Sequence, residues 1–428
     1  MTRPGLSPRL LVAAGLALGL AGCSADNSVA SNPGPLVFTL GADSAWSGGT
    51  VDVTATRFAE QTYTPVFVSG TDTLPASRAG DSTYAVRIPI GPAGPVPLAL
   101  QDGARRFEVG TVERAGFREV QWYTPGFDYS MQIQARRQGV PVVLGNGPAG
   151  ITLAYPSLHR SERITGLRAP FDYYGIGQSY RGDEFVLRDS LGVVGRWELW
   201  PAPRQRGTWP SAARARQGTI MSPTTFLEVS RHNTQTVDTT SPARGYGPFF
   251  TEDCWNVHLS PRTDRVVLRS VSSHAGVPVI NSLTADTAYT IPRMVSLGSA
   301  GFTADGAEFF AAGYYPPRDS LRRVDASTGT ILASAALPEG EGPRNLEVDP
   351  AGRFVYLHLN ADCRPRIVVY DARTLAMVGD LRVPLSVDPG PCDNGAWEGM
   401  LVVDTAPDRL YVVWNGEPFP VFEFTSLP

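Results

Sequence analysis

The C-terminal part of the sequence repeats itself at a constant spacing. Asp325 opens the segment Asp-Ala-Ser-Thr-Gly, and Asp371, 46 residues later, opens Asp-Ala-Arg-Thr. Gly306 and Gly352, also 46 residues apart, each lie in a tight turn that leads into a run of apolar and aromatic residues. A constant offset at two separate elements predicts a series of equal structural units. Short strands and turns fill each unit, so the units are expected to be β-sheets.

The composition agrees with a chain of strands and turns, and it predicts an all-β fold. The 428 residues include 44 Gly and 37 Pro, and in a helix interior Gly costs about 1 kcal/mol and Pro about 3 kcal/mol relative to Ala. All 37 basic residues are Arg, and the formal net charge is -4. The chain therefore lacks the basic footprint of a nucleic-acid-binding protein, and no nucleic-acid partner is expected.

The repeated unit resembles the blades of YVTN/PQQ-like β-propellers, which have four antiparallel strands each. In the clearest unit, 343–384, a first strand is expected to end at Asp349-Pro350. Three further strands are expected at 353–359, 366–370 and 377–383.

The resemblance implies a β-propeller over residues 116–428. Dividing this length by about 45 residues per blade gives about seven four-stranded blades. Six or eight remain open, because the stretch 116–250 repeats poorly. The chain ends after a third strand at 421–424. Phe117–Tyr123 is therefore expected to supply the missing fourth strand and to remove an open sheet edge.

Residues 36–115 are expected to form a separate β-sandwich. Apolar and polar residues alternate at 51–55, 84–88 and 96–100, and turn residues separate these runs. The segment Ser47-Gly48-Gly49-Thr50-Val51 and the strands after it resemble TIG/IPT-type immunoglobulin-like domains. No Cys lies in this stretch, so the core disulfide of antibody domains is not expected.

The N-terminus has the order of parts typical of an exported lipoprotein. Arg3 and Arg9 precede an apolar run at 10–20, which is too short for a permanent membrane helix. The run ends in Leu-Ala-Gly-Cys23, which resembles the lipobox of bacterial lipoproteins. This implies a signal peptide at 1–22, lipidation of Cys23 and a flexible tether at 23–35. It also implies anchoring to the cell envelope, at the outer membrane if the host has one.

Three further Cys residues follow, in a compartment that permits disulfides. In the propeller interpretation, Cys363 lies between the second and third strands of its blade, and Cys392 lies in the loop that enters the next blade. These loops open on one face, so we predict a Cys363–Cys392 disulfide. Cys254 enters an earlier blade on the same face and is expected to be free, although three Cys allow three pairings.

The same face would carry acids and aromatics that could bind a cation or a polar ligand. A structural alternative is that these residues cap turns and pack between blades. The predicted binding face consists of Asp253, Trp255, Asp362, Asp393, Trp397 and Glu398.

No catalytic constellation is visible in the sequence. There is no G-x-S-x-G motif, the five His lie far apart, and no Cys/His spacing fits zinc. We assign no catalytic residue, metal or cofactor. We expect a lipid-anchored platform that binds or scaffolds a protein or polysaccharide partner. The alternatives are a propeller hydrolase, lactonase-like or metal-assisted, that uses channel acids, and a purely structural envelope component.

Overall fold

The computed structural model describes residues 36–56 and 65–123, and the strands and many turns from 129 to 425. Every regular element in these ranges is a β-strand. Within 129–425 the residues outside the description are 138–139, 148–149, 156–157, 159, 165–175, 180–183, 189–192, 199–201, 211–214, 221–224, 231–232, 239–243, 250–253, 263, 271–275, 285, 293, 295–296, 314–319, 339–341, 362–363, 383–399, 404–408 and 414–419.

The first nine strands form two sheets, in the orders β1-β3-β7-β6 and β2-β9-β8-β4-β5. We call these two sheets together the sandwich. Side chains that alternate toward the core hold the sheets together. Phe67 and Tyr84, one from each sheet, meet with ring centroids 6.1 Å apart. The strands are β1 (Phe38–Leu40), β2 (Ser44–Trp46), β3 (Thr50–Ala55), β4 (Val66–Ser69), β5 (Asp72–Leu74), β6 (Ala76–Arg78), β7 (Thr83–Arg87), β8 (Gly94–Asp102) and β9 (Arg105–Ala115).

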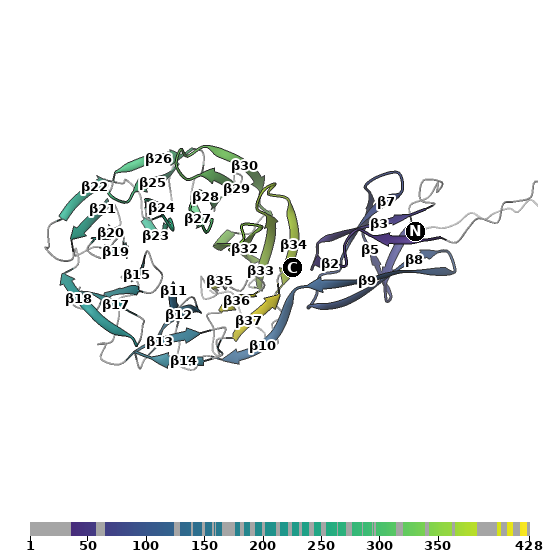
Figure 1. The fold of residues 1–428 in the computed structure, drawn as a ribbon, viewed down its shortest axis with the longest axis horizontal. Helices are drawn as coiled ribbons and strands as arrows, with labels where there is room; N and C mark the ends of the chain where they lie inside the picture. Colours follow the sequence, from purple (N-terminus) through teal and green to yellow (C-terminus); the bar gives the residue numbers. More distant parts are fainter. Residues whose placement is uncertain are drawn as a thin grey trace, which may run out of the picture. The chain divides into compact units, whose positions relative to one another are not determined.

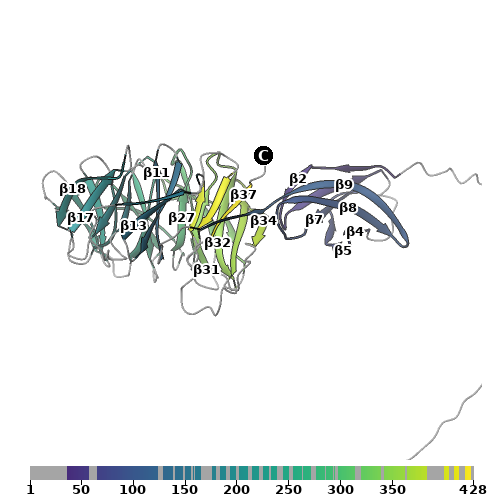
Figure 2. The ribbon, with the colours of Figure 1, turned by 90° about the horizontal axis from the view of Figure 1, so that it is seen from below.

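The remaining strands form sheets that follow one another around a ring (Figure 1). Figure 2 shows this ring from the side, with its strands running from one face of the ring to the other. Most sheets are meanders of four consecutive strands, which we call blades. In one eight-stranded sheet, two such meanders are joined where β15 pairs with β19 in parallel.

The strands of the first half of the ring are β10 (Phe117–Tyr123), β11 (Tyr129–Arg137), β12 (Val140–Gly147), β13 (Gly150–Tyr155), β14 (Arg160–Arg163), β15 (Ile176–Ser179), β16 (Glu184–Arg188), β17 (Val193–Glu198), β18 (Arg204–Pro210), β19 (Ala215–Ile220), β20 (Thr225–Ser230), β21 (Asn233–Asp238) and β22 (Arg244–Phe249). Those of the second half are β23 (Cys254–Leu259), β24 (Arg265–Ser270), β25 (Val277–Asn281), β26 (Thr287–Ile291), β27 (Leu297–Phe302), β28 (Glu308–Gly313), β29 (Ser320–Asp325), β30 (Ile331–Ala336), β31 (Gly342–Val348), β32 (Phe354–Ala361), β33 (Arg364–Asp371), β34 (Met377–Arg382), β35 (Met400–Val403), β36 (Arg409–Val413) and β37 (Pro420–Thr425).

The 46-residue repeat extends to the pairing of individual residues. Glu308 pairs with Asp325 in the blade β27–β30, and Phe354 pairs with Asp371 in the blade β31–β34. Strands β31 to β34 follow the expected order, and each boundary lies within two residues of the prediction. The repeat predicted from sequence is therefore confirmed in these two blades.

The last sheet joins the first strand of the ring to its last three strands, as the sequence predicted. Its order is β10-β37-β36-β35, and β10 pairs with β37 in the antiparallel sense. The register places Phe117 opposite Phe424 and Arg118 opposite Glu423. β10 comes from the start of the ring's sequence and β37 from its end. Their pairing leaves no open sheet edge between these two strands.

Apolar side chains fill the spaces between consecutive blades. One cluster, which includes Phe309 and Val267, packs β27–β30 against β23–β26. A second cluster, which includes Phe310 and Leu357, packs β27–β30 against β31–β34. Full burial of each large side chain contributes roughly 1.5–3 kcal/mol. These clusters hold neighbouring blades in place.

Candidate functional site

Most of the predicted binding face lies outside the described residues. The residues of that face outside the description are Asp253, Asp362, Asp393, Trp397 and Glu398. The predicted lipidation site Cys23 and the predicted disulfide partners Cys363 and Cys392 also lie outside it. Cys254 and Trp255 begin β23, and only their backbone is described. The disulfide and the ligand-binding role of these residues therefore stay predictions.

The topology does place the connections that carry these residues. Cys254 pairs with Ser270, so it lies at the end of its blade away from the β23–β24 turn. Ala361 pairs with Arg364, so the β32–β33 connection leaves from the corresponding end of the next-but-one blade. The predicted face thus corresponds to one end of the antiparallel meanders.

The opposite end of the meanders carries turns that are described in detail. In the β29–β30 turn, Asp325 Oδ1 accepts hydrogen bonds from the Ser327 hydroxyl at 2.7 Å and from the Thr328 amide at 2.8 Å. The Ser327 hydroxyl, followed by the Thr328 groups, lowers the pKa of Asp325 to about 2. The carboxylate therefore acts as a turn cap, with its oxygen engaged inside the turn.

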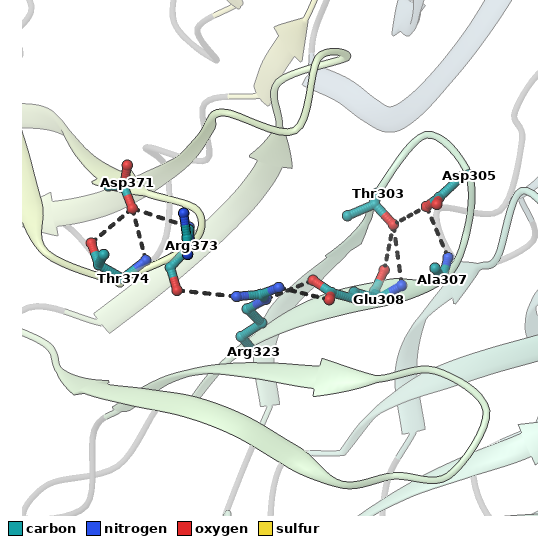
Figure 3. A network of polar contacts seen from close by, with 8 residues as sticks. All are labelled: Thr303, Asp305, Ala307, Glu308, Arg323, Asp371, Arg373 and Thr374. Carbon is teal, nitrogen blue, oxygen red and sulfur yellow. Dashed lines mark hydrogen bonds and ion pairs between the residues drawn. The ribbon is translucent and has the colours of Figure 1, made fainter.

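The β33–β34 turn repeats this arrangement. Asp371 Oδ1 accepts bonds from the Thr374 amide and hydroxyl, each at 2.7 Å (Figure 3). Burial opposes the change, but these bonds lower the pKa of Asp371. The fifth position of the turn is Gly329 in one blade and Leu375 in the other, with φ of 76° and 56°. Leu375 holds this left-handed conformation because its side chain is buried in the core between blades.

Arg323 links the same two blades at this end. Arg323 donates to both oxygens of Glu308 at 2.6 and 2.7 Å, which raises the pKa of Arg323 (Figure 3). The same guanidinium donates to the Arg373 carbonyl oxygen of the next blade at 3.1 Å. Thr303 and Asp305 close the nearby β27–β28 turn through their own hydrogen bonds. The polar groups of this network stabilise turns and blade contacts.

The most specific contact in the described residues joins the sandwich to a blade. Trp46, from β2, is 1% exposed. Its ring meets Phe354 edge-on at 5.6 Å and Tyr356 at 6.1 Å, both on β32. Gly379 on β34 leaves room for the indole, because a Cβ there would lie 2.8 Å from Trp46 Cβ. We call Phe354, Tyr356 and Gly379 the Trp46 socket.

Main-chain groups beside the socket bind the outer edge of the blade. The Asp380 amide donates to the Ser47 carbonyl at 2.8 Å, and the Ser47 hydroxyl donates to the Asp380 carbonyl at 3.3 Å. Gly49 lies so close to the Val378 carbonyl that a side chain there would collide with it. The turn after β2 therefore adds to the edge of β34.

A buried ion pair fixes the strand that receives this turn. Arg366 on β33 donates to both carboxylate oxygens of Asp380, at 2.8 and 2.7 Å. The Asp380 side chain is 3% exposed and the Arg366 side chain 13%. Removal of one partner from such a pair leaves an uncompensated buried charge and typically costs about 3–5 kcal/mol.

The repeat explains why the sandwich contacts this blade. At the equivalent positions of the blade β27–β30, Glu308 stands in place of Phe354, and Ala333 in place of Gly379. The Glu308–Arg323 ion pair occupies the region where an aromatic socket would have to form. The sequence indicates Ser47–Val51 only as part of the sandwich, and nothing in it predicts this contact.

The described residues show neither a membrane-spanning helix nor a grouped metal site. No helix that could cross a membrane occurs in the part of the chain described. Within the same ranges, no three His, Cys, Asp or Glu side chains are placed to hold an ion. His358 lies on β32, within the expected second strand 353–359, and is fully buried.

Comparison with solved structures decides the fold of the ring. The chain is similar to the Cps50 (Swd1) β-propeller domain of Myceliophteria thermophila, with a TM-score of 0.56 and 11% sequence identity. The match covers 73% of this chain and 100% of that domain. The ring is a β-propeller.

A second similar structure is the hydrazine synthase of Kuenenia stuttgartiensis, at 13% identity and a TM-score of 0.45. That match covers 59% of this chain and 77% of the other. No protein-family model matches the sequence, and no curated protein matches it either. The first likeness shows the fold alone, because 11% identity carries no functional information.

Proposed function

We propose that the chain is a lipid-anchored protein of the cell envelope whose propeller is a non-catalytic platform for a protein or polysaccharide partner. In this proposal residues 23–35 are the tether, with the lipid on Cys23, and an immunoglobulin-like, TIG/IPT-like sandwich connects the tether to the propeller. The eight-stranded sheet counts as two blades. With the closing sheet and the four meanders β11–β14, β23–β26, β27–β30 and β31–β34, the propeller then has seven blades.

The Trp46 socket is the observation that carries this proposal. A sandwich joined to a propeller only by the chain between β9 and β10 would reorient freely. Here Trp46 is buried against the blade, and the Ser47 carbonyl accepts a hydrogen bond from the outer strand β34. Such a junction suits a spacer that presents a platform at a defined place relative to its anchor.

The described acids at the end of the propeller opposite the proposed face serve its structure. Oδ1 of Asp325 and Oδ1 of Asp371 each cap a turn, and Glu308 forms an ion pair with Arg323. The end of the propeller with Trp255, Trp397 and the predicted Cys363–Cys392 disulfide is the proposed binding face.

Site-specific photo-cross-linking in cells tests the proposed face. A benzophenone side chain at position 397 or 255 is expected to give discrete adducts with a protein or a glycan, because these positions would touch the partner. Leu283 is the matched control, since it is 78% exposed in the β25–β26 turn at the opposite end. Equal adducts from both ends, or none from 397 and 255, would contradict the proposed binding face.

A further inference from the structure

The outer strand β30 presents an unusual edge. It is the last strand of its sheet, and its only strand partner in the described residues is β29. Residues 329–338 contain no charged side chain. Ile331 and Leu332 are 37% and 46% exposed, and Ser334 and Ala336 are exposed as well. The edge combines unpaired main-chain groups with an apolar, uncharged surface.

The outer strands of most other blades carry the charges that discourage edge-to-edge pairing. β26 has no charge, but it is rich in Thr and Tyr. β30 differs from all of these because its sequence is Ile-Leu-Ala-Ser-Ala-Ala. The charged residues on the other outer strands are Arg118 and Glu119 on β10, Arg160, Glu162 and Arg163 on β14, Arg204 and Arg206 on β18, Arg244 on β22, and Asp380 and Arg382 on β34.

The neighbouring blade shows what such an edge can bind. Both β30 and β34 have a bulge near their start, where Leu332 and Val378 have no partner in the ladder. On β34, the region from Val378 to Asp380 is covered by main-chain groups of Ser47 and Gly49. The equivalent region of β30 runs from Leu332 to Ser334. The fold therefore already uses this edge position to take a turn of small, uncharged residues.

We propose that the β30 edge pairs with the β30 edge of a second copy of this chain. The segment Ala333-Ser334-Ala335-Ala336 is itself small and uncharged, like the Ser47-Gly48-Gly49 turn on β34. Two identical strands pair in the antiparallel sense about a two-fold axis, so each edge is the complement of the other. Uncharged strands meet without like-charge repulsion, and Leu332 adds apolar contact area at the ends. Pairing of one short strand makes a small interface, so the dimer is a weak one.

Thiol cross-linking of the full chain in its native membranes tests this dimer. Ser334→Cys treated with a short bis-maleimide is expected to give a covalent dimer. Thr290→Cys is the matched control, because Thr290 is exposed at the same register position of β26. We expect about tenfold more dimer from position 334 than from 290, which corresponds to about 1.4 kcal/mol.

A charge on the edge provides the second arm of the test. Leu332→Arg in the Ser334→Cys background is expected to reduce the cross-linked dimer about tenfold. Leu332 is half-exposed, and other outer strands already carry Arg, so the blade should tolerate this change. Equal dimer from positions 334 and 290, or dimer that persists with Leu332→Arg, would overturn the proposal. So would the absence of dimer from Ser334→Cys.

Discussion

Replacement of Trp46 by Ala is expected to lower the free energy of unfolding by about 3–5 kcal/mol, as is usual for loss of a fully buried Trp. Trp46 is 1% exposed and contacts Phe354 and Tyr356, which lie more than 300 positions further along the chain. The change would leave an empty socket on the blade and detach the sandwich from β34. Equilibrium denaturation in urea, followed by tryptophan fluorescence and circular dichroism, measures the loss.

A double-mutant cycle separates the free energy of the Trp46–Phe354 contact from what Trp46 contributes to the core of the sandwich. Trp46→Ala and Phe354→Ala should be non-additive by about 0.5–1.5 kcal/mol, the usual coupling of an aromatic pair. The matched control is Phe185→Ala, which removes an equally buried aromatic that stacks on Trp197 in another blade. Trp46→Ala and Phe185→Ala should be additive. Additivity in both cycles would mean that Trp46 does not occupy the socket in solution.

Removal of residues 420–428 is expected to abolish the cooperative unfolding of the propeller. This truncation deletes β37, which lies between β10 and β36 in the closing sheet. β10 would lose its pairing with the rest of the ring, and β36 would become an open edge. Calorimetry and limited proteolysis measure the effect, and the truncated chain should show a broad transition and rapid cleavage.

Removal of 426–428 alone is the control for that truncation. These residues follow β37, so the closing sheet keeps all its strands. The shorter truncation should unfold like the full chain. An unchanged cooperative transition after loss of 420–428 would show that the β10–β37 pairing does not hold the ring together.

The parts of the fold that could be predicted from sequence are those that repeat locally. The turn at Asp325 and the turn at Asp371 have the same hydrogen bonds because the Asp and Thr recur at the same spacing. The strands of 343–384 followed from the positions of these turns. Closure by Phe117–Tyr123 could also be predicted, because the last sheet lacked one strand and this segment begins the propeller range directly after the sandwich.

The contacts that could not be predicted depend on sites far apart in the chain. Nothing near Trp46 indicates that it enters a socket made by Phe354, Tyr356 and Gly379. Only the comparison of equivalent blade positions singles out Gly379, where the neighbouring blade has Ala333. At Leu375 the residue type alone would not predict the observed backbone conformation. Leu375 adopts the conformation of Gly329 because burial outweighs the backbone preference.

Lipid attachment at Cys23 is the central claim about where the protein acts, and metabolic labelling tests it most directly. Cells that express the full chain or Cys23→Ala are grown with radiolabelled palmitate and then fractionated. We predict that the wild-type chain carries label and sediments with membranes, because two or more acyl chains anchor a protein stably. The Cys23→Ala chain should carry no label and leave the membrane fraction. Labelling of Cys23→Ala equal to that of the wild type would contradict the anchored platform.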